Sequence, residues 1–272
     1  MEPVIKWSGS KRSQSKEILK YFPKDINVYY EPFCGGCSML VCLLESGIAV
    51  KEFYCSDLNQ DLINAWKAIK TTPLDVALWY EKLWNELNKD NDLERKKAYY
   101  NNIRQRLNQD HNPLDFIFIM RTTTNGMPRY NQDGMFNNSF HITRNGILPK
   151  TFEEIVMNWS NYLISNDVHF ECCSYQEIKP NKEDFMYLDP PYAHTKGMYF
   201  GNFDVTAFFE WLQQQECKYA LSFDGISVTD NTYAVSEQLY TKHIYLSSGN
   251  SSFRRVIGKN KTCEVFESLY IK

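Results

Sequence analysis

The first sixty residues alternate between short apolar segments and loops in an order that few folds accommodate. Asn27–Tyr30 predicts a short strand, and the loop Pro32–Gly36 leads from it into the helical stretch Ser38–Glu45. A second strand is expected over Lys51–Ser56, and it ends at Asp57. Strand, loop, helix, strand and acid in this order are typical of the start of a doubly wound α/β sheet, which binds ligands at the carboxyl ends of its strands.

The last 120 residues return to the same alternation. Strands are expected at four apolar segments, namely Val168–Cys172, Phe185–Leu188, Tyr219–Phe223 and His243–Leu246. Helices are expected at Val205–Gln215 and near Tyr233–Tyr240, where apolar residues recur at helical spacing. Val265–Ile271 is predicted to close the sheet as an antiparallel edge strand.

The middle of the chain, residues 71–150, has a different character. Pro73 can open a helix, and Leu74–Leu107 is predicted to be helical with many charged residues. Thr122–Gly146 is polar, and within it Asn131–Gly134 is typical of a hairpin turn. A polar stretch of this length in a compact protein usually has a function. We therefore predict an α/β sheet that is split by an inserted helical and hairpin module.

The composition is that of a globular protein, with 23% charged and 15% aromatic residues in a chain of 272. The longest apolar run, Met39–Leu44, is too short to span a bilayer, and residues 1–11 lack the apolar core of a signal peptide. We therefore expect a soluble protein with no membrane contact.

The net charge of −3 excludes a uniformly basic nucleic-acid-binding surface, but the charge is unevenly distributed. Residues 95–150 contain nine basic residues against three acidic ones, a local charge of +6. The nine are Arg95, Lys96, Lys97, Arg104, Arg106, Arg121, Arg129, Arg144 and Lys150. A second basic run contains Arg254, Arg255, Lys259 and Lys261. Basic clusters are often only solvated surface, yet two of them in an acidic chain favour contact with phosphate groups.

Eight cysteines are present, and Cys34 and Cys37 form a C-x-x-C pair. A zinc site would need a second pair at similar spacing, whereas Cys172 and Cys173 are adjacent. We expect reduced thiols in core positions and no metal. A redox pair at Cys34 and Cys37 is the weaker alternative.

An acid and two prolines follow the apolar segment Met186–Leu188 in the sequence Asp189-Pro190-Pro191-Tyr192. The prolines make this turn rigid. An exocyclic amino nitrogen of a base is a poor nucleophile because its lone pair is delocalised. The Asp189 carboxylate and the Pro190 carbonyl could hold that nitrogen toward tetrahedral geometry for attack on a sulfonium methyl, while Tyr192 stacks on the flipped base. An ordinary proline loop with an incidental acid is the alternative.

The loop after the first predicted strand lacks the G-x-G-x-x-G pattern of dinucleotide sites. Its glycines would let the backbone approach a ligand, and Glu31 could pair with an ammonium group. Asp57 could accept hydrogen bonds from both hydroxyls of a ribose. S-adenosylmethionine has an ammonium group and a ribose but no phosphate, which suits a loop flanked by acids. A loop that only packs the core is an equal alternative on this evidence.

Four motifs in order give the chain a resemblance to a known family. They are Lys6-Trp7-Ser8-Gly9-Ser10-Lys11, Glu31-Pro32-Phe33-Cys34-Gly35-Gly36, Ser56-Asp57-Leu58-Asn59 and Asp189-Pro190-Pro191-Tyr192. In this order they resemble the Dam-type (D12 class) DNA adenine methyltransferases. The resemblance implies a Rossmann-like α/β methyltransferase sheet that binds S-adenosylmethionine, with an inserted helical and β-hairpin target-recognition domain. Residues 1–66 and 151–272 would then form the catalytic domain, and residues 67–150 the insert.

The resemblance also implies roles for individual residues. The cofactor would be lined by Trp7, Lys11, Glu31, Phe33, Gly35, Asp57, Ser174 and Tyr175. The segment from Asn125 to Asn131 is similar to the family's recognition hairpin, so that Arg129 would read a guanine, with a phosphate contact as its alternative, and Met127 would touch a thymine methyl. Arg254 and Arg255 would face phosphates. Double-stranded DNA is the expected partner of a cytoplasmic enzyme encoded by a bacterium or phage.

Related functions remain as alternatives. Asp-Pro-Pro-aromatic turns also serve enzymes that methylate RNA adenine or cytosine N4. The long polar hairpin favours readout of duplex DNA over either of them. A DNA-binding relative without catalysis is disfavoured because Glu31, Asp57, Asp189 and Tyr192 are intact. A cognate restriction endonuclease is a candidate partner that this sequence does not reveal.

Overall fold

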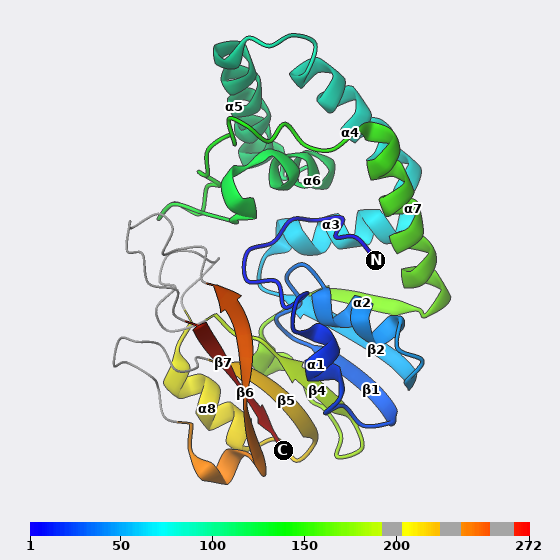
Figure 1. The fold of residues 1–272 in the computed structure, drawn as a ribbon, viewed down its shortest axis with the longest axis vertical. Helices are drawn as coiled ribbons and strands as arrows, with labels where there is room; N and C mark the ends of the chain where they lie inside the picture. The colour runs from blue at the N-terminus through cyan, green and yellow to red at the C-terminus, as the bar shows by residue number, and fades with distance from the viewer. Residues whose placement is uncertain (192–202, 224–234, 251–263) are drawn as a thin grey trace.

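The computed structural model describes residues 1–191, 203–223, 235–250 and 264–272. Within them, seven strands form one sheet in the order β3-β2-β1-β4-β5-β7-β6 (Figure 1). The strands are β1 (Asp25–Glu31), β2 (Ala49–Asp57), β3 (Val168–Cys172), β4 (Phe185–Leu188), β5 (Lys218–Phe223), β6 (Lys242–Asn250) and β7 (Glu264–Ile271). Strands β1 to β5 are parallel, and β7 is antiparallel to both of its neighbours. The predicted Rossmann-like α/β class is confirmed.

Helices cover the sheet and extend beyond one end of it (Figure 1). They are α1 (Ser15–Leu19), α2 (Ser38–Leu44), α3 (Gln60–Thr71), α4 (Pro73–Leu87), α5 (Leu93–Asp110), α6 (Pro113–Thr122), α7 (Pro149–Ser165) and α8 (Val205–Gln213), with 3-10 turns η1 (Thr124–Gly126), η2 (Tyr175–Glu177) and η3 (Glu237–Leu239). Helices α4, α5 and α6 stand above the sheet, and α7 returns from them toward it. None of the helices in the described ranges is long and apolar enough to cross a membrane.

Strand β4 shows why the sheet is covered on both faces. All four of its residues are buried, and successive side chains of a strand point to opposite faces. Phe185 and Tyr187 belong to the apolar core that includes residues of α1, α2 and α3. Met186 and Leu188 pack in a second core with Phe208 of α8. A strand buried on both faces reads as a continuous apolar run, which is how it was recognised in the sequence.

Two predictions at the end of the chain were wrong in detail. Strand β7 is not at the edge of the sheet, because β6 pairs on its outer side. The position of a strand in the sheet depends on pairing with segments that are distant in the chain, and an apolar run does not indicate these partners. The helix expected near Tyr233–Tyr240 is, in its described part, only the 3-10 turn Glu237–Leu239.

The long helix expected over Leu74–Leu107 is two helices, α4 and α5. Helix α4 begins at Pro73, as predicted, and ends at Leu87. The side chain of Asp92 then accepts hydrogen bonds from the backbone N–H groups of Glu94 and Arg95, which starts α5. The prediction missed this N-cap because charged residues continue through the break.

Helix α6 is the buried centre of the module above the sheet, and every residue from Asp115 to Thr122 is buried. It packs against α3, α4 and α5. The carboxylate of Asp115 has no exposure and accepts hydrogen bonds from Arg106 Nη2 at 2.6 Å and Trp79 Nε1 at 2.8 Å. A charge buried to this extent is stable only when it is paired.

We expect Asp115→Leu to lower the free energy of unfolding by about 2–3 kcal/mol, less than for a fully buried pair because Arg106 is partly solvated. The substitution leaves the Trp79 indole N–H without its acceptor and Arg106 without its counter-charge. Chemical denaturation measures the change, and Asp110→Leu on the exposed end of α5 is the control. A change no larger than that of the control would contradict the prediction.

Candidate active site

The predicted acids lie at the carboxyl ends of adjacent parallel strands. Glu31 ends β1, Asp57 ends β2, and Asp189 follows directly after β4. Strands β2 and β3 lie on one side of β1, while β4 and β5 continue on the other, so the strand order reverses between β1 and β4. Ligands of doubly wound sheets bind in the crevice that opens at such a reversal. The fold therefore gathers these three acids at the position expected for a ligand site.

The glycine loop after β1 is shaped by the ring of Trp7. Gly35 has a φ of +44°, and a Cβ atom there would lie 2.7 Å from Nε1 of Trp7. A Cβ on Gly36 would lie 2.9 Å from Cβ of Trp7. The carbonyl of Gly35 accepts a hydrogen bond from Trp66 Nε1 at 2.9 Å, and its N–H donates to Asp57 at 3.2 Å. Glycine is thus required both by the backbone conformation and by the close approach of Trp7.

Glu31 is a buried carboxyl group held by a hydrogen bond. Its side chain accepts a hydrogen bond of 2.7 Å from the hydroxyl of Tyr29. Burial raises the pKa of Glu31 to about 8, the negative charge of Asp189 adds to this rise, and the Tyr29 hydrogen bond partly opposes it. A carboxyl group with so high a pKa is stabilised in its charged form when a cation binds beside it.

Asp57 is the second acid of the site. Burial raises its pKa to about 6, although the backbone N–H groups of Asn59 and Gly35 donate to it and oppose the rise. The N–H of Leu58 opposes the rise as well, and the carboxylate, which has about four acceptor positions, keeps capacity for a further hydrogen bond. That Asp57 binds ribose hydroxyls stays a prediction.

Asp189 lies beside a buried lysine. The Nζ atom of Lys11 is 3.1 Å from Oδ1 of Asp189 and 3.1 Å from Oε2 of Glu267 on β7. Burial lowers the pKa of Lys11, but the charges of Asp189 and Glu267 more than compensate and raise it above its usual value. The amino group of Lys11, which the resemblance assigned to the cofactor, therefore contacts the catalytic turn. Pro190 is buried, whereas Tyr192 lies outside the described residues.

Aromatic rings cluster around Phe33, which follows Glu31 by two residues. The centroid of the Phe33 ring lies 5.5 Å from that of Tyr175 and 5.9 Å from that of Phe203. Ser174 is adjacent, but its hydroxyl caps the turn η2 by accepting a hydrogen bond from the N–H of Gln176. Phe33 and Tyr175 thus belong to one aromatic cluster, and their contact with a cofactor ring stays a prediction, whereas the side chain of Ser174 has a local structural partner.

The predicted hairpin is present in the module above the sheet. Tyr130 and Phe136 form an antiparallel bridge, and Gly134 has the positive φ, +74°, that the turn requires. The side-chain oxygen of Asn131 accepts hydrogen bonds from the backbone N–H groups of Asp133 and Met135. Asn131, which the sequence predicted both in this turn and, with Asn125, as a DNA-contacting residue, therefore stabilises the turn through its own side chain.

The recognition residues differ in exposure. Asn125 and Arg129 are exposed, and Met127 is half-buried. Asn125 has the left-handed backbone conformation, with φ of 59°. Exposed side chains on a hairpin are free to contact a partner, which is consistent with the predicted role of Arg129. Arg254 and Arg255 lie outside the described residues.

The sequence did not predict that the N-terminal segment joins the hairpin to the ligand site. The N–H of Ser8 donates to the carbonyl of Gly126 at 3.0 Å. The side chain of Asn59, two residues after Asp57, donates to the hydroxyl of Tyr130 at 2.9 Å. Both contacts connect the hairpin to motifs that surround the acids. A hydrogen bond between residues so far apart in the chain leaves no signal in the local sequence.

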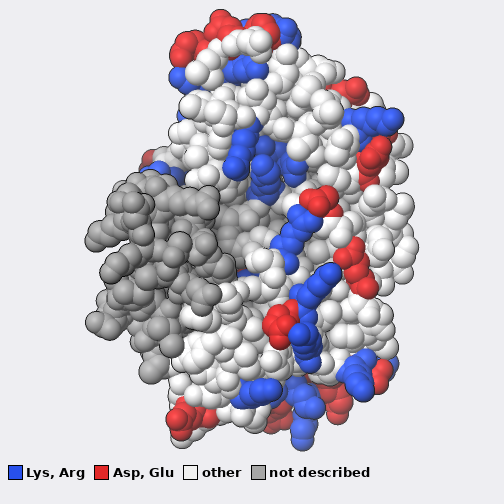
Figure 2. Space-filling model, viewed as in Figure 1, with Lys and Arg blue, Asp and Glu red and all other residues white. Residues whose placement is uncertain are grey.

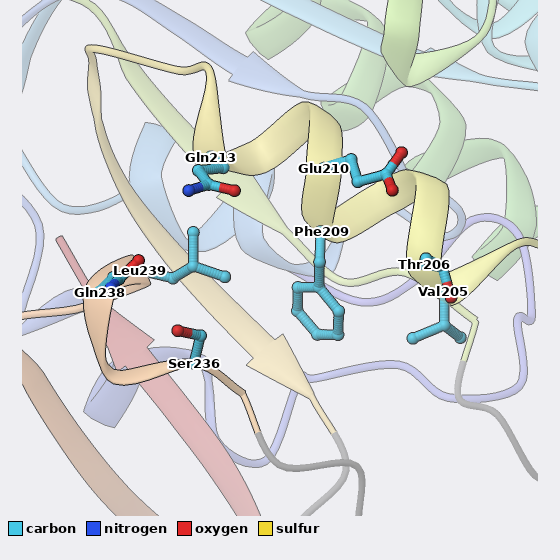
Figure 3. Close-up of a pocket in the computed structure, with 8 residues that line it drawn as sticks. All are labelled: Val205, Thr206, Phe209, Glu210, Gln213, Ser236, Gln238 and Leu239. Atoms are coloured by element: carbon cyan, nitrogen blue, oxygen red, sulfur yellow. The ribbon is translucent and has the colours of Figure 1, made fainter.

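Among the cavities lined by the described residues, two lie outside the acid cluster. One, of about 260 Å³, lies between α8 and η3, where Phe209 and Leu239 face the space between the two elements (Figure 3). None of the predicted site residues lines it. The other, of about 170 Å³, is bordered by Trp7 and Gly36 and by the basic residues Lys6, Arg12 and Arg144. The first cavity is remote from the predicted chemistry, and the second adjoins it.

The second cavity is electropositive. Burial lowers the pKa of Lys6, and the charges of Arg121 and Arg144 lower it further. Arg12 is paired with Glu2, whose oxygens accept from both terminal guanidinium nitrogens. Basic side chains gather across the middle of this face of the molecule (Figure 2). Cations that repel one another in a cavity favour the binding of an anion.

The C-x-x-C pair contains buried thiols rather than a metal site. Burial raises the pKa of Cys34 to about 12 and that of Cys37 well above its usual value, so both thiols are protonated at neutral pH. In the part of the chain that the structure describes, no cluster of three or more His, Cys, Asp or Glu residues could hold a metal ion. The thiols pack in the core, as the sequence predicted.

Residues 7–262 match the family model described as D12 class N6 adenine-specific DNA methyltransferase. The chain belongs to this family. It is an adenine-specific DNA methyltransferase, and the match extends from the Trp7 motif through the hairpin after Asn125 and the turn at Asp189. The resemblance inferred from four motifs is therefore confirmed.

Individual relatives support the assignment to the D12 class. The type II methyltransferase M.MjaIII of Methanocaldococcus jannaschii is 31% identical over 208 residues, which are 71% of this chain and 69% of the relative. The type II methyltransferase M1.LlaDCHI of Lactococcus lactis subsp. cremoris is 23% identical, with 88% of this chain and 84% of the relative covered. The retron Ec67 DNA adenine methylase of Escherichia coli is 27% identical, with coverages of 72% and 65%.

Proposed function

We propose that this DNA adenine methyltransferase uses S-adenosylmethionine to methylate N6 of an adenine flipped out of duplex DNA. The observation that carries the proposal is the placement of Glu31, Asp57 and Asp189 at the carboxyl ends of β1, β2 and β4. Residues 1–66 and 151–272 would perform the catalysis, and residues 67–150 would recognise the target.

The acids and rings fit the proposed cofactor. The buried carboxyl of Glu31 would bind its ammonium group, and Asp57 would accept from the ribose hydroxyls. Phe33 and Tyr175 would contact its adenine ring. When bound, the cofactor supplies a sulfonium methyl group as the electrophile. The glycine loop, fixed by Trp7, would keep the backbone close to the ligand.

The catalytic turn would prepare the substrate amino group. The Asp189 carboxylate and the Pro190 carbonyl would accept hydrogen bonds from its two N–H groups. These two acceptors would hold the nitrogen toward tetrahedral geometry. The prolines fix the positions of these acceptors, so that little reorganisation is needed during the reaction. Tyr192 would stack on the flipped base, a role assigned from the sequence because this residue lies outside the described ones.

Duplex DNA would lie across the basic face, with its backbone reaching the cavity of Lys6 and Arg144. Arg129 and Met127 on the hairpin would contact base edges in the major groove, and Asn125 would assist them. The exposed position of Arg129 supports this role. Arg254 and Arg255 would add phosphate contacts from a part of the chain that the structure does not describe.

One assay tests the proposed function. Purified protein with tritiated S-adenosylmethionine should label duplex plasmid DNA that lacks adenine methylation, and digestion should recover the label in N6-methyladenine. Sequencing of the methylated positions then gives the target. Label only in single-stranded DNA or RNA would contradict the duplex substrate, and cofactor binding without any label would indicate a non-catalytic DNA-binding protein.

We expect the variant Lys6→Ala/Arg144→Ala to show a weaker salt dependence of DNA binding. Each phosphate contact that is lost should lower the slope of log affinity against log salt by about 0.9, so the double variant should lose roughly 1–2 units. Fluorescence anisotropy on a duplex with the mapped target measures the slope. Lys218→Ala, exposed at the start of β5, is the matched control. A slope equal to that of the control would contradict the proposed phosphate contact of Lys6 and Arg144.

A further inference from the structure

Glu267 is a charged residue beside the catalytic turn to which no sequence motif drew attention. Its Oε2 atom and Oδ1 of Asp189 are each 3.1 Å from the same Nζ atom of Lys11. The Lys11 side chain is only 5% exposed and those of Asp189 and Glu267 are 20% and 22% exposed, so water screens the three charges only in part. Strand β5 separates β4 from β7, and only the completed sheet with the N-terminal segment brings these groups together.

We propose that Glu267 is a positioning residue for methyl transfer, which acts through Lys11 to orient the Asp189 carboxylate and to keep a net negative charge beside the substrate amino group. The inference rests on the proposed function of Asp189 as an acceptor for that group. Lys11 and Asp189 by themselves would form a neutral pair. Glu267 gives the triplet a net charge of −1, if both carboxyl groups are ionised.

The net negative charge of the triplet would stabilise the transition state of methyl transfer. In methyl transfer the nitrogen lone pair would form the N–C bond, and the electron pair of the broken C–S bond would stay on sulfur, which becomes a neutral thioether. The amino nitrogen then carries the positive charge until it loses a proton to solvent. A net negative triplet stabilises the positive charge that develops at nitrogen more than a neutral pair does. A lysine shared between two carboxylates also withdraws less charge from Asp189, which then accepts a stronger hydrogen bond.

The other ionisable groups around the turn do not replace Glu267. Glu31 on β1 accepts a hydrogen bond from Tyr29, and in the proposed complex its charge would be paired with the cofactor ammonium group. Tyr187 on β4 interacts with Lys11, but its hydroxyl is bonded to the buried Ser222. Among the groups that the structure describes here, Glu267 is thus the acid placed to share Lys11 with Asp189.

The test is the single-turnover rate of methylation by Glu267→Gln. We expect the rate to fall by roughly 10- to 100-fold, less than the roughly 100- to 1000-fold loss for a group that contacts the transition state directly, because Glu267 acts through Lys11. Cofactor and DNA affinities should stay within about threefold. In the plot of rate against pH, the rise on the acid side should move to lower pH. Lys11 would then pair with Asp189 alone and would lower the pKa of that carboxyl group further. A purely structural defect would not move this rise.

Matched variants complete the test. Glu267→Asp should recover part of the rate, and Glu216→Gln, exposed before β5, should behave like the wild type. In a Lys11→Met background, the addition of Glu267→Gln should cause no further loss of methylation rate, because Lys11, through which Glu267 acts on Asp189, is already absent. Should Lys11→Met fail to fold, the pH profile and Glu267→Asp decide the question.

The outcomes separate the two proposals. If Asp189→Asn is inactive while Glu267→Gln has a wild-type rate or an unmoved rise on the acid side, only the role of Glu267 is overturned. If the effects of Glu267→Gln and Lys11→Met are additive, Glu267 does not act through Lys11. If Asp189→Asn keeps its activity, the proposed function of the turn is overturned, and the role of Glu267 is overturned with it.

Discussion

Asp189→Asn should lower the single-turnover rate of methylation by about 1000-fold. Asparagine has nearly the shape of aspartate, but it replaces one acceptor oxygen by an NH₂ donor and removes the negative charge. The amino group of the base would lose a charge-assisted acceptor, and its lone pair would stay delocalised in the ring. Lys11 would keep Glu267 as a partner, so we expect the fold to survive.

The prediction is specific to the chemical step. Cofactor affinity, measured by calorimetry, should stay within about threefold of the wild type, since Asp189 is not assigned to cofactor binding. Asp25→Asn makes the same change at the exposed, opposite end of β1 and should leave the rate unaltered. A rate for Asp189→Asn within tenfold of the wild type would mean that another group accepts the amino hydrogens.

The second large effect concerns Glu31 and pH. Burial raises the pKa of this carboxyl group to about 8. The cofactor ammonium needs the ionised form, so binding should release a proton below pH 8. Affinity should then rise by up to tenfold per pH unit between about pH 6 and 8, and it should fall again at higher pH as the cofactor's own amino group, with a pKa of about 8, loses its proton.

Glu31→Gln should abolish most of this rise and lower the affinity at pH 8 by roughly 10- to 100-fold. Calorimetry in buffers of different ionisation enthalpy counts the released proton directly. Glu52→Gln, exposed on the neighbouring strand β2, is the control. The same rise of affinity with pH in wild type and Glu31→Gln would show that Glu31 does not bind the ammonium group.

The same carboxyl group affects the stability of the protein without ligand. Its pKa in the folded state is above its value in the unfolded state, so the stability it contributes is present at low pH and is lost as the pH rises toward 8. Glu31→Gln should therefore be more stable than the wild type at pH 8 and equally stable near pH 4. A difference that does not depend on pH would contradict this explanation.

The motifs of the ligand site were predictable because each is local. Asp189 and Pro190 are consecutive, and they follow an apolar strand whose burial the composition alone indicates. Glu31 ends a strand and precedes a glycine loop, which fixes its position at the carboxyl edge of the sheet. In each case the chemical groups and the backbone geometry come from residues within one short segment, so the sequence was sufficient to predict where these residues lie.

The helical module shows the limit of this reasoning. The sequence indicated an insert between two α/β parts, and Figure 1 shows α4, α5 and α6 standing beyond the sheet. The apolar residues of these helices nevertheless belong to the same continuous core as those of α2 and α3. Composition reveals which residues are apolar, but it does not reveal which neighbours bury them.

The sequence by itself determined the order of the strands along the chain, the rigid turn at Asp189 and the acids that flank the glycine loop. Only the tertiary structure decided that β7 lies inside the sheet, that Trp7 requires glycine at position 35, and that Lys11 joins Asp189 to Glu267. The physical reason is the range of the interactions. Backbone preferences and periodicity act over a few neighbouring residues, whereas strand pairing and ion pairs depend on where distant segments meet.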